Sequence, residues 1–185
     1  MLKDLMAEAS GKMERAVEAL VEDLRAIRTG RASPALLERI VVEYYGTMTP
    51  LNQVSTISVP EPRMLTIRPW ESSMIGAIEK AILKSELGLT PTNDGKLIRL
   101  IIPRLSEERR NDLSRVVHRR VEEAKVSVRN LRREAIEELR EFEAEKLISE
   151  DDLYKGREQI QELTDKYVAQ TDEIGQRKEE EIREV

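Results

Sequence analysis

Apolar residues recur every three or four positions at the start of the chain, the spacing that lines one face of an α-helix. The row consists of Leu2, Met6, Ala9, Met13, Ala16 and Leu20, and after a short break Leu24 and Ile27 continue it. The pattern predicts one amphipathic helix over residues 2–27.

The second half of the chain repeats this spacing over greater lengths. Residues 107–147 contain neither glycine nor proline, and their apolar row is Leu113, Val117, Val121, Ala124, Val128, Leu131, Ala135, Leu139 and Phe142. Ser106 is a suitable N-cap for this helix. Residues 149–152, Ser-Glu-Asp-Asp, predict a capping box that opens another helix. The apolar row of that helix is Leu153, Ile160, Leu163, Tyr167, Ile174 and Ile182.

These three helices have narrow apolar stripes between charged flanks, so none can bury its stripe alone. A helix of about forty residues is roughly 60 Å long, which exceeds the width of a compact globule of this size. We therefore expect a long three-helix bundle, in which residues 2–28 pack against a hairpin of 106–148 and 150–184.

The middle of the chain has a different pattern, with short β-branched runs separated by prolines. Such runs predict strands at 40–45, 54–59, 64–68 and 97–102, and residues 93–95, Asn-Asp-Gly, predict a turn. Between them, a helix capped by Ser72 or Ser73 is expected to bury Ile75, Ile78, Ile82 and Leu83. Tyr44, Tyr45 and Trp70 are interpreted as strand and core residues.

The fold class is therefore α+β, a helical bundle with an inserted small β/α/β domain. Residues 1–29 and 106–185 form the bundle, and residues 31–104 form the inserted domain. The chain leaves and re-enters the bundle, so two linkers, 29–33 and 103–106, run side by side. Gly30 permits unusual backbone angles, and Pro34 holds Ser33 extended. From the residues alone, a hinge and a rigid junction are equally good interpretations.

Composition narrows the possible chemistry. The chain has no cysteine, which excludes disulfides and thiolate chemistry, and it lacks the glycine-rich nucleotide-binding motifs. The only histidine, His118, is interpreted as a surface residue, and a helix N-terminus explains Asp151 and Asp152. We therefore expect no enzyme, no cofactor and no metal. Without a leader or a long apolar run, the protein is expected to be soluble and cytoplasmic.

Charge is unevenly distributed along this acidic chain, whose net charge is −5. Residues 104–133 hold ten Lys and Arg against five Asp and Glu, whereas the last third is strongly acidic. Helical spacing places four cations on one side of the second long helix: Lys125, Arg129, Arg132 and Arg133. Arginine binds phosphates through two parallel hydrogen bonds, so this row is a candidate RNA contact. The alternative is that these cations pair with acids of neighbouring helices.

Five long motifs follow one another along the chain: RTGRASPALL, VEYYGTMTPLNQ, EKAILKSELGLTPTNDG, IPRLSEERRNDL and VRNLRREA. In this order and at this spacing they resemble the motifs of bacterial ribosome recycling factors. The resemblance implies an L-shaped, two-domain protein that binds the 70S ribosome and its 50S subunit. With elongation factor G and GTP, it would split the post-termination ribosome into subunits. A monomer that binds neither DNA nor membrane is expected.

The resemblance also implies roles for particular residues. Arg132, with Arg129 and Arg133 beside it, matches the family's contact with large-subunit ribosomal RNA, and helical spacing adds Lys125 to this candidate site. The family's hinge region matches Arg28, Thr29, Gly30 and Arg31 in the first linker. The second linker, through which the chain returns to the bundle, is Pro103, Arg104, Leu105 and Ser106. The alternative function is a coiled-coil scaffold without an RNA role, which the same helices would allow.

Overall fold

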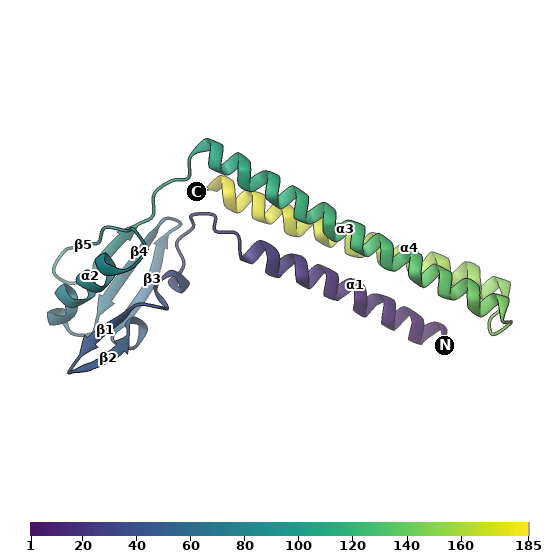
Figure 1. The fold of residues 1–185 in the computed structure, drawn as a ribbon, viewed down its shortest axis with the longest axis horizontal. Helices are drawn as coiled ribbons and strands as arrows, with labels where there is room; N and C mark the ends of the chain where they lie inside the picture. The colour runs from purple at the N-terminus through teal and green to yellow at the C-terminus, as the bar shows by residue number, and fades with distance from the viewer. Residues whose placement is uncertain (185) are drawn as a thin grey trace. The chain divides into compact units, whose positions relative to one another are not determined.

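The computed structural model describes residues 1–184, which form two compact units (Figure 1). One unit comprises Met1–Arg28 and Glu108–Arg183, and the other contains Thr29–Glu107. The long helices are α1 (Leu2–Arg25), α3 (Glu107–Ala144) and α4 (Glu150–Glu184). The α+β class predicted from the sequence is confirmed.

The three long helices bury their apolar stripes against one another. One core cluster joins Leu5, Ala9, Ala135, Leu139 and Ile160, and another joins Met13, Val17, Val128 and Tyr167. Each cluster draws residues from α1, α3 and α4, as expected of a three-helix bundle. The stripe of α1 differs from the prediction, because its buried residues include Leu5 and Val17, whereas Leu2, Met6 and Ala16 are half-buried.

The buried face of α4 differs more, because much of it is not apolar. Gly156, Thr164, Thr171 and Gly175 are buried there, whereas the predicted Leu153, Leu163 and Ile174 are half-buried. A Cβ added at Gly156 would lie 2.8 Å from Leu139 Cδ1, and one at Gly175 would lie 2.6 Å from Val121 Cγ2. Glycine therefore lets α4 approach α3 more closely than any other residue could.

Two helix ends show how local chemistry sets the limits of the hairpin. The capping box is confirmed, since Asp152 N donates to Ser149 Oγ at 3.1 Å and Ser149 N donates to Asp152 Oδ2 at 3.2 Å. The end of α3 at Ala144 is earlier than predicted. Lys146 adopts a left-handed conformation there, and Leu147 N donates to Phe142 O at 2.8 Å, a Schellman arrangement usually built on glycine.

The second unit consists of short strands with one α-helix, α2 (Ile75–Lys84). Its strands are β1 (Val41–Tyr44), β2 (Thr47–Pro50), β3 (Ser55–Glu61), β4 (Met64–Pro69), β5 (Thr92–Asn93) and β6 (Ile98–Ile101). One antiparallel sheet has the order β3-β4-β6-β5, and β1 pairs with β2 in a separate hairpin. The core comprises residues of both sheets and α2, including Leu65, Ile67, Ile78, Ile82 and Leu100.

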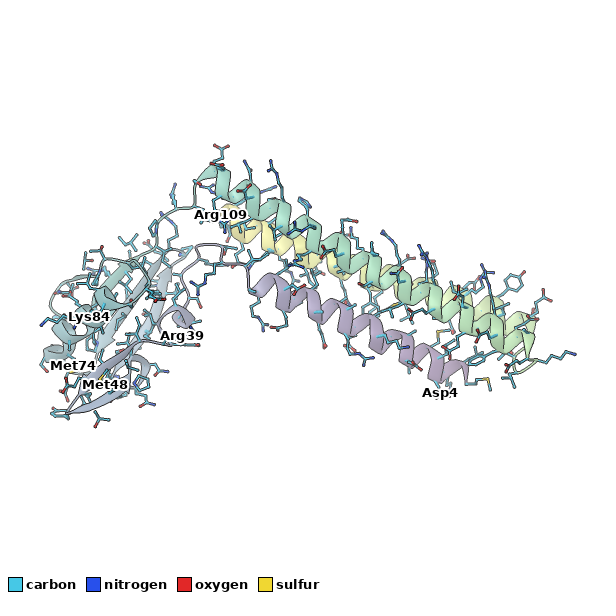
Figure 2. All side chains as sticks on the ribbon, in the orientation of Figure 1. Asp4, Arg39, Met48, Met74, Lys84 and Arg109 are labelled. Carbon is cyan, nitrogen blue, oxygen red and sulfur yellow. The ribbon has the colours of Figure 1, made fainter. Side chains whose placement is uncertain are left out.

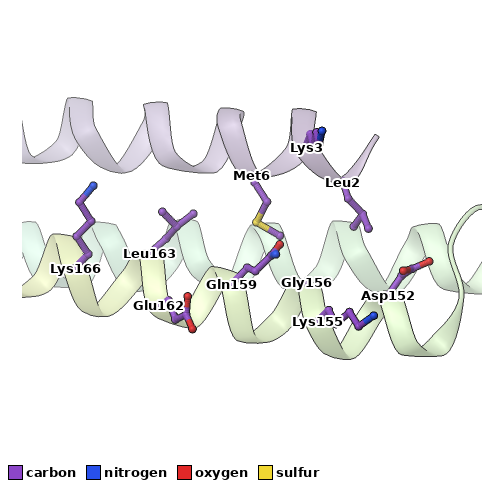
Figure 3. A pocket seen from close by; sticks show the side chains of 10 residues that line it. All are labelled: Leu2, Lys3, Met6, Asp152, Lys155, Gly156, Gln159, Glu162, Leu163 and Lys166. Atoms are coloured by element: carbon purple, nitrogen blue, oxygen red, sulfur yellow. The ribbon is translucent and has the colours of Figure 1, made fainter.

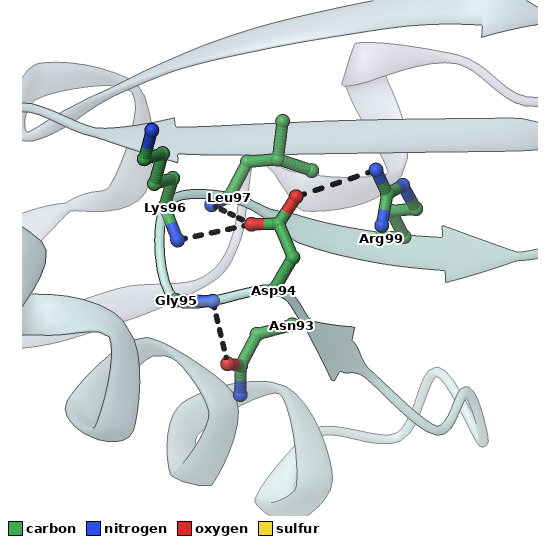
Figure 4. Close-up of polar contacts among 6 residues, drawn as sticks. All are labelled: Asn93, Asp94, Gly95, Lys96, Leu97 and Arg99. Carbon is green, nitrogen blue, oxygen red and sulfur yellow. Dashed lines mark hydrogen bonds and ion pairs between the residues drawn. The ribbon is translucent and has the colours of Figure 1, made fainter.

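The predicted turn at residues 93–95 is confirmed. Asp94 Oδ1 accepts hydrogen bonds from Lys96 N at 2.9 Å and Leu97 N at 3.0 Å, and Asn93 Oδ1 accepts one from Gly95 N at 3.1 Å (Figure 4). Backbone donation from Leu97 and Lys96 lowers the pKa of Asp94 below its ordinary value of 3.8. This carboxylate therefore holds the connection into β6.

Other expectations for this unit are wrong. Neither serine caps α2, because the short 3-10 helix Ser72–Met74 runs into it and Met74 occupies its N-cap position. Leu83 is exposed, since its place on α2 faces away from the sheet. Tyr45 and Trp70 are 81% and 69% exposed, so they do not fill the core. Their position at a turn and just after a strand end explains this.

Candidate nucleic-acid interface

Three arginines follow one side of α3 in its central turns. Val128 and Ala135 on the same stretch are buried in the bundle, which leaves Arg129 and Arg133 exposed and Arg132 half-buried at the edge of the packed stripe. Within residues 1–184, no carboxylate oxygen lies within 4.0 Å of a nitrogen of these arginines. Their positive charge is thus available to a partner.

Lys125, predicted as the fourth cation of this row, has a different environment. Its side chain is only 14% exposed, and its Nζ lies 2.5 Å from Asp172 Oδ1 on α4 and 3.2 Å from Glu122 Oε1. The hydrogen bond to Asp172 raises the pKa of Lys125 above its ordinary value. For Lys125, the alternative interpretation is the correct one: it pairs with an acid of a neighbouring helix, and two carboxylates offset its charge.

Arg132 is held by a side chain that the sequence reasoning missed. Its Nη1 donates to Gln161 Oε1 on α4 at 3.3 Å, and Gln161 Nε2 donates to Asp165 Oδ1 at 2.8 Å. Asp165 fixes the amide so that its oxygen faces the guanidinium. No pattern within α3 or α4 identifies Gln161, because its contact depends on the register between the two helices.

Other charged side chains on α3 have acidic partners within the chain, so their presence does not require a binding partner. His118 Nε2 lies 2.6 Å from Glu179 Oε1, which also accepts a hydrogen bond from Ser114 Oγ at 3.1 Å. Arg120 lies 3.4 Å from Glu123, one turn along the helix. His118 is exposed, as the sequence suggested.

The two segments predicted as a hinge have no regular secondary structure. Gly30 has a φ of 77°, in the left-handed region that favours glycine. Arg28 and Arg31 are exposed, as are Pro103, Arg104 and Ser106, whereas Thr29 is buried and Leu105 is half-buried.

Where the two linkers enter the inserted unit, both are hydrogen-bonded to the same short segment of it. Ala32 N donates to Pro62 O at 2.7 Å, and Ile102 N donates to Arg63 O at 2.8 Å. Ala32 and Ile102 are also buried in the core of this unit. The two linkers are therefore anchored to Pro62 and Arg63, which are neighbours in the sequence.

A groove of about 750 Å³ lies between the start of α1 and the start of α4 (Figure 3). Leu2, Met6 and Leu163 provide its apolar wall, and Gly156 lies among them without a side chain. Lys3, Lys155 and Lys166 alternate with Asp152 and Glu162 around it. This mixture of charges favours neither an anionic nor a cationic ligand.

Two further features bear on the possible chemistry. Among the described residues, no group of three His, Asp or Glu side chains is arranged to hold a metal ion. The helices of residues 1–184 also lack an apolar stretch of membrane-spanning length.

Comparison with known proteins supplies the family. The family model described as ribosome recycling factor matches residues 20–182. The ribosome-recycling factor of Roseiflexus castenholzii is 56% identical over 185 residues, covering both chains fully. That of Carboxydothermus hydrogenoformans is 52% identical over 182 residues, covering 98% of each chain.

Solved structures agree with this match. A solution structure of the ribosome recycling factor is 46% identical, covers 100% of this chain and 98% of its own, and has a TM-score of 0.66. A model of the T. thermophilus ribosome recycling factor, bound with E. coli elongation factor G to the E. coli post-termination complex, is 44% identical. It covers 98% of each chain with a TM-score of 0.60.

Proposed function

Because the chain belongs to the ribosome recycling factor family, we propose that it binds the post-termination ribosome and, with elongation factor G and GTP, splits it into subunits. The observation that carries the proposal is the match to named relatives over the whole chain. The solved relative on the post-termination complex with elongation factor G supplies the partners. In this proposal the protein acts as a cytoplasmic monomer on the 70S ribosome and 50S subunit.

The contact with ribosomal RNA in this proposal is the row of Arg129, Arg132 and Arg133. Arginine side chains without a carboxylate partner among residues 1–184 suit phosphates, which they can bind through paired hydrogen bonds. Lys125 lies in the same row, and its two acidic partners reduce its attraction for phosphate. We therefore expect the arginines to contribute more than Lys125 to the affinity.

Gln161 has a positioning role in this interface. A carboxylate at its place would hold Arg132 more strongly but would also offset its charge. The neutral amide, itself oriented by Asp165, fixes one side of the guanidinium and leaves its positive charge for RNA. Arg132 thereby loses less conformational entropy when it binds.

The proposed action is mechanical: the bundle anchors on RNA while the inserted domain moves on its two linkers. The irregular backbone of residues 28–31 and 103–106 supports this, as does Gly30. The linkers end at adjacent anchor points on Pro62 and Arg63, so a rotation of the inserted domain requires angle changes in few residues. GTP hydrolysis by elongation factor G supplies the energy, so this chain needs no catalytic group.

Light scattering by purified 70S ribosomes tests the proposal, since the signal falls when subunits separate. We expect a decrease that requires this protein, elongation factor G and GTP together. A protein that neither cosediments with 70S or 50S particles nor lowers the scattering would instead act as a helical scaffold.

A further inference from the structure

Tyr45 occupies a backbone position that disfavours it. With Gly46 it forms the two-residue tip between β1 and β2, and their φ angles of 49° and 81° are those of a type I′ turn. Asn, Asp and Gly suit such angles, whereas a bulky aromatic residue is strained there. Burial does not compensate, because Tyr45 is 81% exposed. An aromatic residue held in a disfavoured conformation at an exposed turn is a candidate for a functional contact.

The ring of Tyr45 is fixed by its neighbours. Tyr45 Oη donates to Glu71 Oε2 at 3.2 Å, and Tyr44 Oη donates to Glu71 Oε1 at 2.9 Å. The two rings meet edge to face with centroids 4.5 Å apart. Tyrosine hydroxyls are protonated donors at neutral pH, and the hydrogen bonds to Glu71 raise the pKa of both tyrosines further. The result is an ordered aromatic platform with a carboxylate at its edge.

The charge of this carboxylate is not offset within the described chain. In residues 1–184, no Lys, Arg or His nitrogen lies within 4.0 Å of Glu71. Glu43 pairs across the strands with Met48, which is 62% exposed and is labelled in Figure 2. The hairpin thus exposes the Tyr45 ring at its tip, and Glu43 and Met48 along its strands.

We propose that Tyr45 at the hairpin tip, together with Glu71 from the segment that follows β4, docks an arginine of a partner protein. A guanidinium can stack on the exposed ring and form an ion pair with Glu71, whereas an ammonium lacks the planar surface for stacking. RNA is the less suitable partner, because Glu43 and Glu71 repel phosphates. This surface lies in the inserted unit, so the inference goes beyond the RNA contact on α3.

A peptide titration tests the chemistry without a ribosome. The isotope-labelled full chain is titrated with a blocked peptide of alternating glycine and arginine, and with the same peptide carrying citrulline, which has the shape of arginine without its charge. We expect the amide signals of Tyr45, Gly46 and Glu71 to shift with arginine and not with citrulline. Equal shifts, or shifts confined to other residues, would overturn the inference.

Two variants separate binding from folding. Tyr45→Asn removes the ring and suits the turn, and Glu71→Gln keeps a hydrogen-bond acceptor and removes the charge. Each should weaken arginine-peptide binding about two- to fivefold, the scale of an exposed cation–π contact. Neither should lower the melting temperature appreciably. Unchanged affinity in both variants would contradict the proposal.

A cross-link identifies the class of partner. The variant Tyr45→p-benzoylphenylalanine is bound to purified 70S ribosomes with and without elongation factor G, then irradiated. We expect a cross-link to a protein segment beside an arginine. A cross-link to RNA alone, or none from ribosome-bound protein, would overturn the inference and leave the proposed function intact. Failure to bind ribosomes would contradict the proposed function, and the peptide titration would then decide the inference.

Discussion

Arg132 is the residue whose contribution to RNA binding can be isolated best. Arg132→Ala removes a multidentate cation, and alanine is well tolerated in a helix. We expect affinity for 50S subunits to fall by about 1 to 3 kcal/mol, or about 5- to 150-fold, and the salt dependence to weaken. Arg132→Lys should restore only part of the loss, because it lacks the planar fork. Filter binding at two salt concentrations measures both effects.

The matched control is Arg119, an exposed arginine of α3 outside the row. Arg119→Ala should change 50S affinity much less. If Arg132→Ala lowers the melting temperature sharply yet binds normally, Arg132 is a structural residue and the proposed RNA contact is wrong.

Gln161 should act through Arg132. Gln161→Met removes the amide and keeps similar volume, so we expect 50S affinity to fall at least about twofold in the wild-type background. In the Arg132→Ala background the same change should have no effect on 50S affinity, because the guanidinium that Gln161 orients is absent. Independent, additive losses in this double-mutant cycle would show that Gln161 contacts the ribosome itself or has no positioning role.

Asp94 gives a stability effect that depends on pH. Its folded pKa is lowered, so its stabilising contribution is complete above its ordinary value of 3.8 and is lost as the pH falls through the lower folded value. Asp94→Ala should therefore destabilise the inserted unit near pH 7, and the difference from wild type should shrink below about pH 4. Urea denaturation at several pH values measures it. A difference independent of pH would mean that the charged carboxylate does not cap this turn.

At the scale of elements, the approach of α4 to α3 depends on Gly175. A Cβ there would lie 2.6 Å from Val121 Cγ2. Overpacking lowers the free energy of unfolding by about 1 to 3 kcal/mol, whereas the higher helix propensity of alanine raises it by about 1 kcal/mol. We expect Gly175→Ala to lower the free energy of unfolding by about 1 kcal/mol in chemical denaturation.

Gly11 in α1 is the matched control, because a Cβ there meets nothing within 4 Å. Gly11→Ala should raise stability by up to about 1 kcal/mol. Combining Gly175→Ala with Val121→Ala should cost less than the two separate losses together, since the smaller side chain makes room. If Gly175→Ala is stabilising, the helices are free to separate and close packing does not limit this position.

At the scale of the whole molecule, Gly30 tests the proposed hinge. Valine is strained at a φ of 77°, so Gly30→Val restricts the backbone angles that the linker can adopt. We expect slower ribosome splitting in stopped-flow light scattering, with 50S binding nearly unchanged. Ala35→Val, in the short 3-10 helix after the linker, is a control for added bulk. If binding and splitting decrease together, the hinge explanation is wrong.

The sequence by itself determined the element types and most of the core. Periodicity predicted the buried residues of α3 from Leu113 to Leu139, apart from the half-buried Leu131, because a long helix with one apolar stripe has few other ways to bury it. It also predicted the capping box and the Asn-Asp-Gly turn, since their hydrogen bonds are local. Strands β2 and β5 were missed because short, polar edge strands lack an alternating apolar pattern.

Only the tertiary structure decided which side chains meet across elements. Apolar periodicity cannot identify Gly156 and Gly175 as buried, because their role is to be small where two helices come close. The arginine row followed from spacing within one helix. The neutralisation of Lys125 by Asp172 and the positioning of Arg132 by Gln161 depend on the register of α4 against α3. That register is set by packing, which no local pattern encodes.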